Sequence, residues 1–176
     1  IVLLPLNPKY TLRETSFYLQ DSKAKAAVLT TKSNDILLGV SVTKAESIRG
    51  QLDACEPIHD LVTITEESPA MILYTSGTTG PPKGVMVTDK MLRASSYASA
   101  QSSAAKMGDI FLVWEPLYHI GAIQLLPLAL DVGVELALVG RFSASRFWEQ
   151  VSTVRATQIH FLGGILQMLL RQPPTL

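Results

Sequence analysis

The sequence predicts an α/β fold in which doubly wound, mostly parallel sheets are layered with helices. Short apolar segments with the character of strands alternate with helical segments along the 176 residues, and this alternation is typical of parallel sheets covered by helices. Hydrophobic residues make up 47% of the chain and charged residues 17%, which favours a well-buried core. A chain of this length buries roughly 70% of its unfolded surface on folding.

The first part of the chain, residues 1–68, is expected to contain three strands and two helices. Each predicted helix begins with a capping box, in which a threonine is followed three residues later by a glutamate. Thr11 and Glu14 form the first box. The second box joins Thr43 to Glu46. The predicted strands are Val2–Leu4, Ala26–Leu29 and Asp60–Ile64.

The second part, residues 69–176, continues the alternation of strands and helices. The predicted strands are Met71–Tyr74, Gly84–Val87, Asp109–Trp114, a segment ending at Val139, and Thr157–Phe161. The predicted helices run from a cap at Thr88 or Asp89 to Lys106, up to Leu130, over Phe147–Val154 and over Ile165–Arg171. Gly108 stops the first of these helices, and two prolines stop the last.

One short loop between two predicted strands concentrates groups that bind phosphate. Glycines let backbone N–H groups approach an anion closely, while hydroxyl groups and an ammonium group add further donors. All of these are present in one run, which reads Thr75, Ser76, Gly77, Thr78, Thr79, Gly80, Pro81, Pro82, Lys83 and Gly84. We therefore expect this loop to hold the phosphates of a nucleotide.

The phosphate loop of the large NTPase class, G-x-x-x-x-G-K-[ST], is a rival interpretation that the residues do not support. Counted from Gly77, the lysine falls in the right place, but Pro82 occupies the position of the second glycine. Gly84 replaces the hydroxyl that would bind Mg²⁺. The NTPase loop also opens a helix, whereas Lys83 leads into a β-branched stretch that is typical of a strand.

The same ten residues resemble, in order and in residue type, the phosphate-loop signature of the adenylate-forming (AMP-binding) superfamily. This superfamily includes acyl-CoA synthetases, beetle luciferases and the adenylation domains of nonribosomal peptide synthesis. Leu6–Pro8, before the loop, and Glu115–Gly121, after it, also resemble acyl-CoA synthetases. Within the superfamily, residues 141–148 and 160–167 look most similar to crotonobetaine/carnitine-CoA ligases.

The resemblance implies an ATP-dependent acyl-CoA ligase with a layered, luciferase-like α/β fold. Such an enzyme activates a small carboxylic acid as an acyl-adenylate, and the thiol of coenzyme A then displaces AMP. ATP, Mg²⁺ and coenzyme A are therefore the implied cofactors. Lys83 is the implied catalytic residue of the loop because a lysine suits the β- and γ-phosphates. The implied phosphate-binding residues are Thr75, Ser76, Gly77, Thr78, Thr79, Gly80 and Lys83.

Two histidines occupy segments that the resemblance associates with the acyl pocket. His119 is implied to border this pocket and the route of the thiol, and it is the second catalytic candidate beside Lys83. The alternative is a core histidine that is hydrogen-bonded to a backbone carbonyl. For His160 the acyl site and plain burial remain equally open.

Charge and composition exclude several other functions. Fifteen basic and fifteen acidic residues cancel, so no net field favours nucleic acid. The longest apolar stretch, residues 122–140, contains Asp131 and Glu135, which an integral membrane helix tolerates poorly. Cys55 and His59 provide too few ligands for a metal site. A single cysteine permits no internal disulfide, which suits a cytoplasmic protein.

The family motifs for adenine, ribose and the C-terminal lysine are not found in these 176 residues. We therefore expect residues 1–176 to be a partial AMP-binding N-terminal domain, in portions 1–68 and 69–176, that lacks the C-terminal domain and is inactive alone. Two alternatives remain open: an adenylating enzyme with a carrier-protein acceptor, and a non-catalytic remnant that binds nucleotide. A homo-oligomeric state and a role in fatty acid metabolism are compatible with the family.

Overall fold

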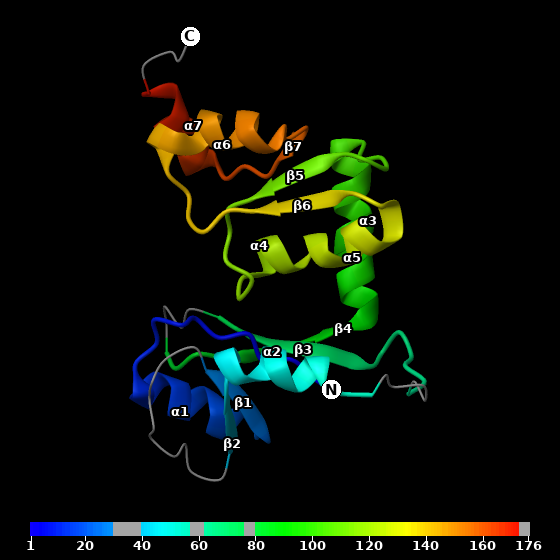
Figure 1. The fold of residues 1–176 in the computed structure, drawn as a ribbon, viewed down its shortest axis with the longest axis vertical. Helices are drawn as coiled ribbons and strands as arrows, with labels where there is room; N and C mark the ends of the chain where they lie inside the picture. Colours follow the sequence, from blue (N-terminus) through cyan, green and yellow to red (C-terminus); the bar gives the residue numbers. More distant parts are fainter. Residues whose placement is uncertain (30–39, 57–61, 76–79, 173–176) are drawn as a thin grey trace. The chain divides into compact units, whose positions relative to one another are not determined.

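The computed structural model consists of two compact units, Ile1–Val87 and Thr88–Leu176 (Figure 1). Strands and helices are present in each unit. The structure describes residues 1–29, 40–56, 62–75 and 80–172.

The first unit contains two small sheets and two helices. Its elements are α1 (Leu12–Asp21), β1 (Ala26–Leu29), β2 (Ser41–Lys44), α2 (Ala45–Asp53), β3 (Pro69–Tyr74) and β4 (Gly84–Thr88). Strands β1 and β2 pair in parallel, with Ala26 opposite Ser41, and β3 pairs with β4. Of the predicted strand at Val2–Leu4, Leu3 forms one parallel bridge to Met71.

The start of α1 is set by its capping box, which confirms the prediction. The Thr11 hydroxyl accepts the Glu14 N–H at 3.3 Å, and the Glu14 carboxylate accepts the Thr11 N–H at 2.7 Å. The box predicted at Thr43 is wrong, because Thr43 lies in strand β2. Lys44 precedes α2 and makes no side-chain capping bond.

Aromatic side chains join α1 to β3, the strand that leads into the glycine-rich loop. Tyr18 is 6% exposed, stacks on Tyr10 with ring centroids 4.9 Å apart, and meets Tyr74 edge-on at 4.6 Å. The Tyr74 hydroxyl donates a hydrogen bond to the Asp21 carboxylate. Burial, followed by this bond to a carboxylate, raises the pKa of Tyr74. The start of the loop is thus fixed to the helix layer.

The strand predicted at Asp60–Ile64 is wrong in its described part. Asp60 and Leu61 lie outside the described residues, and no strand forms over 62–65. Val62 is 86% exposed and Ile64 is 62% exposed. The described part of this segment has β-propensity but is not part of a sheet. An extended segment that pairs with no neighbouring strand gains little stability.

The second unit is built on a three-stranded parallel sheet with the order β6-β5-β7. The strands are β5 (Ile110–Val113), β6 (Glu135–Leu138) and β7 (Gln158–Ile159). The helical elements are α3 (Asp89–Ser103), α4 (Ile120–Ile123), α5 (Leu125–Val132), the 3₁₀ turn η1 (Ala144–Arg146), α6 (Phe147–Val154) and α7 (Gly163–Leu170). The parallel pairing confirms the sequence prediction.

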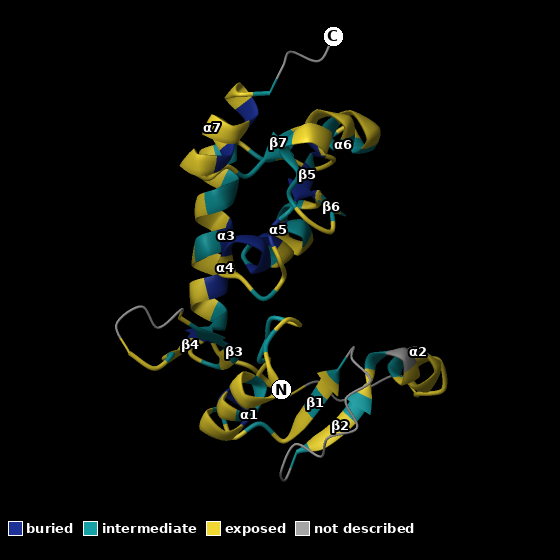
Figure 2. Cartoon of the chain, turned by 90° about the vertical axis from the view of Figure 1, so that its left-hand side faces the viewer, coloured by how far each residue is buried: buried dark blue, intermediate teal, exposed yellow. Residues whose placement is uncertain are grey.

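Both faces of the central strand β5 are covered, and Figure 2 colours much of this strand as buried. Phe111 and Val113, which are 5% and 3% exposed, pack with Leu128 of α5. Leu112, which is 1% exposed, packs on the opposite side with Phe147 of α6 and with α7. Because side chains alternate along a strand, one apolar segment anchors two helix layers.

Helix ends follow the sequence signals only in part. Thr88 caps α3 by accepting the Met91 N–H at 3.3 Å. That helix ends at Ser103, with Ala104 in the left-handed region at φ 50°, and therefore before the predicted end at Lys106. The apolar stretch 122–140 is divided by a turn at Gly133, whose φ is 79°.

No helix in the described part of the chain is long and apolar enough to cross a membrane.

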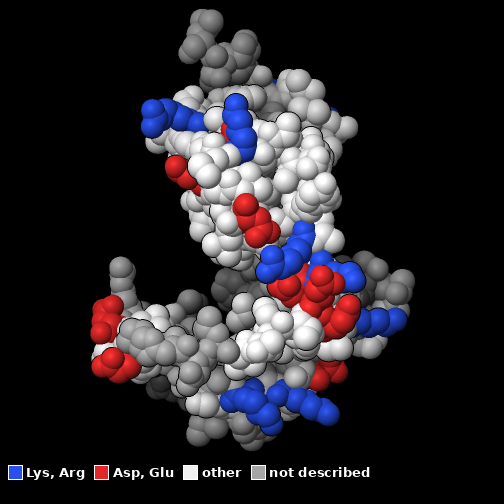
Figure 3. All heavy atoms as spheres, turned by 90° about the vertical axis from the view of Figure 1, so that its right-hand side faces the viewer, with Lys and Arg blue, Asp and Glu red and all other residues white. Residues whose placement is uncertain are grey.

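The charged side chains are distributed in small groups. On the face shown in Figure 3, acidic and basic side chains alternate with broad uncharged areas. This distribution accords with the equal numbers of basic and acidic residues, 15 each.

Asp109 connects the starts of β5 and β7. It is 6% exposed, and its carboxylate accepts the Lys106 N–H and the Thr157 hydroxyl, both at 2.8 Å. The Thr157 oxygen in turn accepts the Ile110 N–H at 3.0 Å. The Lys106 N–H, followed by the Thr157 hydroxyl, lowers the pKa of Asp109.

We expect Asp109→Asn to lower the stability of the chain at pH 7. A carboxyl group with a lowered pKa stabilises the fold above its unfolded value of about 4, and this contribution is lost as the pH falls through the folded value. The difference between wild type and variant should therefore shrink below about pH 4. Thermal unfolding from pH 7 to pH 3 measures it, with the exposed Asp53→Asn as control. A constant difference across this range would contradict the linkage.

Candidate functional site

The two ends of the glycine-rich loop are hydrogen-bonded to each other. The Thr75 N–H donates to the Lys83 carbonyl at 3.0 Å, and the Lys83 N–H donates to the Thr75 hydroxyl oxygen at 3.4 Å. Thr75 follows β3 and Lys83 precedes β4, so the loop closes between the end of β3 and the start of its paired strand β4. This closure brings the Thr75 hydroxyl and the Lys83 backbone to one place.

Gly84 leaves little room for a side chain where the loop enters β4. A Cβ atom at this position would lie 3.0 Å from Ile72 Cγ2 and 3.1 Å from Tyr74 Cζ. At Gly80, by contrast, the space that a Cβ would occupy is open. Four predicted phosphate-binding residues lie outside the described part of the chain, and their role stays a prediction: Ser76, Gly77, Thr78 and Thr79.

The described residues of the loop have the chemistry that a polyphosphate requires. The Thr75 oxygen accepts from the Lys83 amide, while its own O–H remains able to donate. The Lys83 side chain is exposed, so its ammonium can meet an anion as a mobile point charge. These donors are of the kind that bind phosphate oxygens, and their role at this end of the loop stays a prediction.

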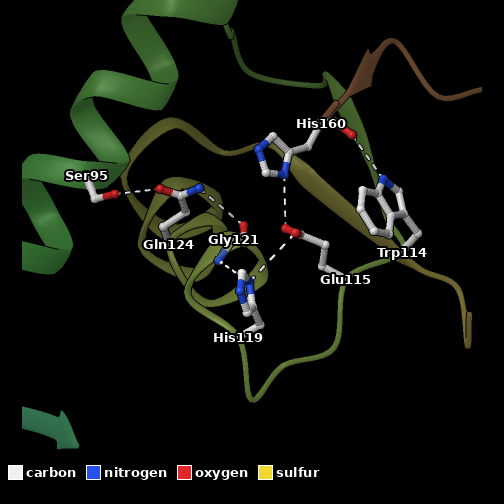
Figure 4. A network of polar contacts seen from close by, with 7 residues as sticks. All are labelled: Ser95, Trp114, Glu115, His119, Gly121, Gln124 and His160. Carbon is white, nitrogen blue, oxygen red and sulfur yellow. Dashed lines mark hydrogen bonds and ion pairs between the residues drawn. The ribbon is translucent and has the colours of Figure 1, made fainter. Parts of the chain in front are cut away.

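A second group of polar residues gathers in the second unit, beyond the carboxyl ends of β5 and β7 (Figure 4). At its centre is Glu115, whose side chain is 6% exposed. Glu115 Oε2 lies 3.0 Å from Nδ1 of His160, and Oε1 lies 3.7 Å from Nδ1 of His119. One buried carboxylate thus lies between two imidazoles from different parts of the chain.

Hydrogen bonds position the ring of His119 and the backbone of His160. His119 is the N-cap of α4, and its Nδ1 accepts the Gly121 N–H at 3.2 Å. Its side chain is 59% exposed, which argues against the alternative of a core histidine. Trp114 Nε1 donates to the His160 carbonyl at 3.0 Å, and this bond ties the end of β5 to the residue after β7.

Gly121 leaves the space that the Glu115 carboxylate fills. A Cβ atom at Gly121 would lie 1.9 Å from Glu115 Oε2. The Gly121 carbonyl accepts from Gln124 Nε2 at 3.3 Å, and Ser95 donates to the Gln124 side-chain oxygen at 2.5 Å. The carboxylate therefore packs directly on a helix start that is itself held by α3.

Sequence reasoning selected His119 and left His160 open, but it did not single out Glu115. The only local signal is a carboxylate directly after an apolar strand, at Trp114–Glu115. The connection between Glu115 and His160 spans 45 positions and depends on the pairing of β5 with β7. Within the described residues, no group of three or more histidine, cysteine, aspartate or glutamate side chains could hold a metal ion.

Comparisons with known proteins agree on one family. The model of the AMP-binding enzyme family matches residues 1–176. Crotonobetaine/carnitine–CoA ligase of Escherichia coli O1:K1 is 28% identical over 195 residues, which cover 99% of this chain and 38% of the ligase. The same values hold for the ligase of Shigella sonnei. The chain thus spans well under half the length of these relatives.

Solved structures show the same fold. The o-succinylbenzoate CoA synthetase of Bacillus subtilis, in complex with its acyl-adenylate intermediate, matches with a TM-score of 0.86 and 26% identity, over 98% of this chain and 45% of that protein. The N-terminal domain of FACL13 from Mycobacterium tuberculosis also has a TM-score of 0.86, with 24% identity, over 98% of this chain and 46% of that one.

These matches confirm the predicted α/β fold, its assignment to a partial N-terminal domain of the acyl-CoA synthetase fold, and the resemblance on which that assignment was based. Because the family model matches the full sequence, the chain belongs to the AMP-binding enzyme family.

Proposed function

We propose that this chain is the phosphate-holding part of an ATP-dependent acyl-CoA ligase. An oxygen of the acid's carboxylate attacks the α-phosphorus of ATP, and the bond from that phosphorus to the pyrophosphate oxygen breaks. The sulfur of coenzyme A then attacks the acyl carbon, and AMP leaves. The observation that carries the proposal is the closed loop between Thr75 and Lys83, in a chain of the AMP-binding enzyme family.

The loop acts on the first step, in which negative charge develops on the departing pyrophosphate. We assign the Lys83 ammonium to the β- and γ-phosphates and the Thr75 hydroxyl to a neighbouring oxygen. A charge-assisted hydrogen bond of this kind contributes about 1.5–3 kcal/mol. Such donors accelerate the reaction only as far as they bind the transition state more tightly than the substrate. Mg²⁺, when bound, neutralises the remaining phosphate charge.

Similar proteins support this assignment of substrates. The Bacillus subtilis o-succinylbenzoate CoA synthetase has been solved with ATP and magnesium ion, and that structure matches this chain with 25% identity and a TM-score of 0.83. The matched curated relatives are named as CoA ligases. We therefore assign ATP, Mg²⁺ and coenzyme A to the intact protein, with a small carboxylic acid as its substrate.

The acyl pocket is assigned to the second unit. His119, largely exposed at the start of α4, would border the acid and the incoming thiol. His160, 35% exposed, lies on the other side of the same buried carboxylate. Because both rings keep one nitrogen outside this contact, both can meet a substrate atom.

Replacement of Lys83 by alanine in the intact protein should slow adenylation about 100- to 1,000-fold, as expected when one preorganised donor to the transition state is lost. Lys83→Arg should retain part of the rate, since the charge remains but its geometry changes. ATP–pyrophosphate exchange measures the step, and circular dichroism checks the fold. Lys25→Ala, at another exposed lysine, is the matched control. An unchanged exchange rate in Lys83→Ala would remove Lys83 from this role.

Trapping the activated acid tests adenylation, and comparing thiols identifies the acceptor of the acyl group. With hydroxylamine present, we expect the intact protein to release an acyl hydroxamate that depends on ATP and on the acid. Without hydroxylamine, coenzyme A should yield a thioester, whereas carrier-protein thiols should not. Acids of graded length and charge are compared in the same assay. A preference for carrier protein would replace the proposed acceptor, and the absence of any hydroxamate would favour a non-catalytic nucleotide-binding protein.

A further inference from the structure

The buried carboxylate of Glu115 has no place in the activity assigned above. Its two oxygens face Nδ1 of His160 and Nδ1 of His119. Among the described residues, no lysine or arginine ion pair with Glu115 is found. The carboxylate is therefore committed to the two imidazoles rather than to a basic side chain.

We propose that Glu115 is a positioning residue that holds His160 with its proton on Nδ1, beside a His119 that the Gly121 N–H holds in the opposite tautomer, so that the acyl site offers one hydrogen-bond acceptor and one donor. The proposal rests on the proposed function in so far as that function assigns both histidines to the acyl pocket. Glu115 itself acts through the His160 ring and not on the substrate.

The tautomer of His160 follows from its contact with Glu115. An ionised carboxylate only accepts hydrogen bonds, and Nδ1 of His160 lies 3.0 Å from Glu115 Oε2. Nδ1 must therefore carry the proton and donate it. In the neutral ring Nε2 is then a lone-pair acceptor. A carboxylate that holds one nitrogen of a histidine in this way is a common device for orienting the other nitrogen.

The tautomer of His119 is the reverse. Its Nδ1 accepts the Gly121 N–H at 3.2 Å, so this nitrogen carries a lone pair and the proton lies on Nε2. The separation of 3.7 Å between Nδ1 and Glu115 Oε1 is too long for a hydrogen bond. The Gly121 N–H bond sets the orientation of the ring, and with Nδ1 on the side of the carboxylate, Nε2–H points away from it.

The surroundings leave the carboxylate little freedom. Gly121 provides its space, since any Cβ there would lie 1.9 Å from Oε2. The Trp114–His160 bond of 3.0 Å fixes the backbone that carries the second ring. With the side chain of Glu115 only 6% exposed, water cannot readily replace either histidine as its partner.

The consequence for the substrate is a directional site. Nε2–H of His119 donates a hydrogen bond to a polar substrate atom, and the lone pair of His160 Nε2 accepts one. A site built in this way discriminates against molecules whose donors and acceptors are exchanged, because two donors or two acceptors would then face each other. Glu115 would thus contribute to acid selection without touching the acid.

The first test combines spectroscopy with kinetics on the intact protein. Long-range ¹H–¹⁵N spectra of labelled histidines, assigned with His119→Gln and His160→Gln, should show the proton on Nδ1 of His160 and on Nε2 of His119. In Glu115→Gln the amide can donate or accept, so the single tautomer of His160 should be lost. We expect kcat/KM for the acid to fall about 10- to 100-fold, as when the carboxylate partner of a metal-bound histidine is removed, with KM for ATP unchanged.

Glu149→Gln, at an exposed glutamate of α6, is the matched control and should alter neither the spectra nor the kinetics. A proton on Nε2 of wild-type His160 would overturn the proposal. So would a Glu115→Gln protein with wild-type spectra and kcat/KM. The two proposals fail in different measurements. If the proposed function is wrong, Lys83→Ala does not change ATP–pyrophosphate exchange, whereas the histidine spectra still show the tautomers assigned here.

A second variant approaches the same contact from the opposite side. Gly121→Ala should displace the carboxylate and reproduce the spectra and the reduced kcat/KM of Glu115→Gln, and the two changes together should not be additive because they disrupt one contact. Gly164→Ala, in α7 with open space around its Cβ position, should have no effect. A Gly121→Ala protein whose His160 keeps its wild-type spectrum would overturn the assigned geometry.

Discussion

Burial of β5 on both faces is the constraint on which the second unit depends. Phe111 and Val113 anchor one helix layer, while Leu112 anchors the other. Full burial of one such side chain contributes about 1.5–3 kcal/mol. Because the strand is held from both sides, its end cannot shift without disturbing both layers. The residues that follow it, including Glu115, therefore start from a fixed position.

The candidate functional residues lie in segments that connect a strand to the element that follows it. In parallel α/β sheets, ligands bind beyond the carboxyl ends of the strands, and the second unit places Glu115 and His160 at the ends of β5 and β7. In the first unit the loop closes between the end of β3 and the start of β4, through Thr75 and Lys83. Rigid strands thus hold side chains that belong to connecting segments.

The two groups of residues differ in their electrostatics. The loop offers an exposed ammonium and a hydroxyl, which suit a charged ligand that brings its own counterions. Around Glu115 the charge belongs to the protein and is buried, where an unpaired group would be costly. Histidine can satisfy such a carboxylate while retaining a second nitrogen for other contacts. The same few residues can therefore stabilise the fold and present polar atoms to a ligand.

The sequence alone determined the features that depend on neighbouring residues. The capping box at Thr11, the cap at Thr88 and the ten-residue loop signature are short-range patterns, and the alternation of apolar segments was enough to predict a parallel α/β fold. Only the tertiary structure decided that Thr43 belongs to a strand, because Ser41–Lys44 gains its pairing from β1. It also decided the contact between Glu115 and His160, which are 45 positions apart. That contact follows from the parallel register of β5 and β7, which no local pattern specifies.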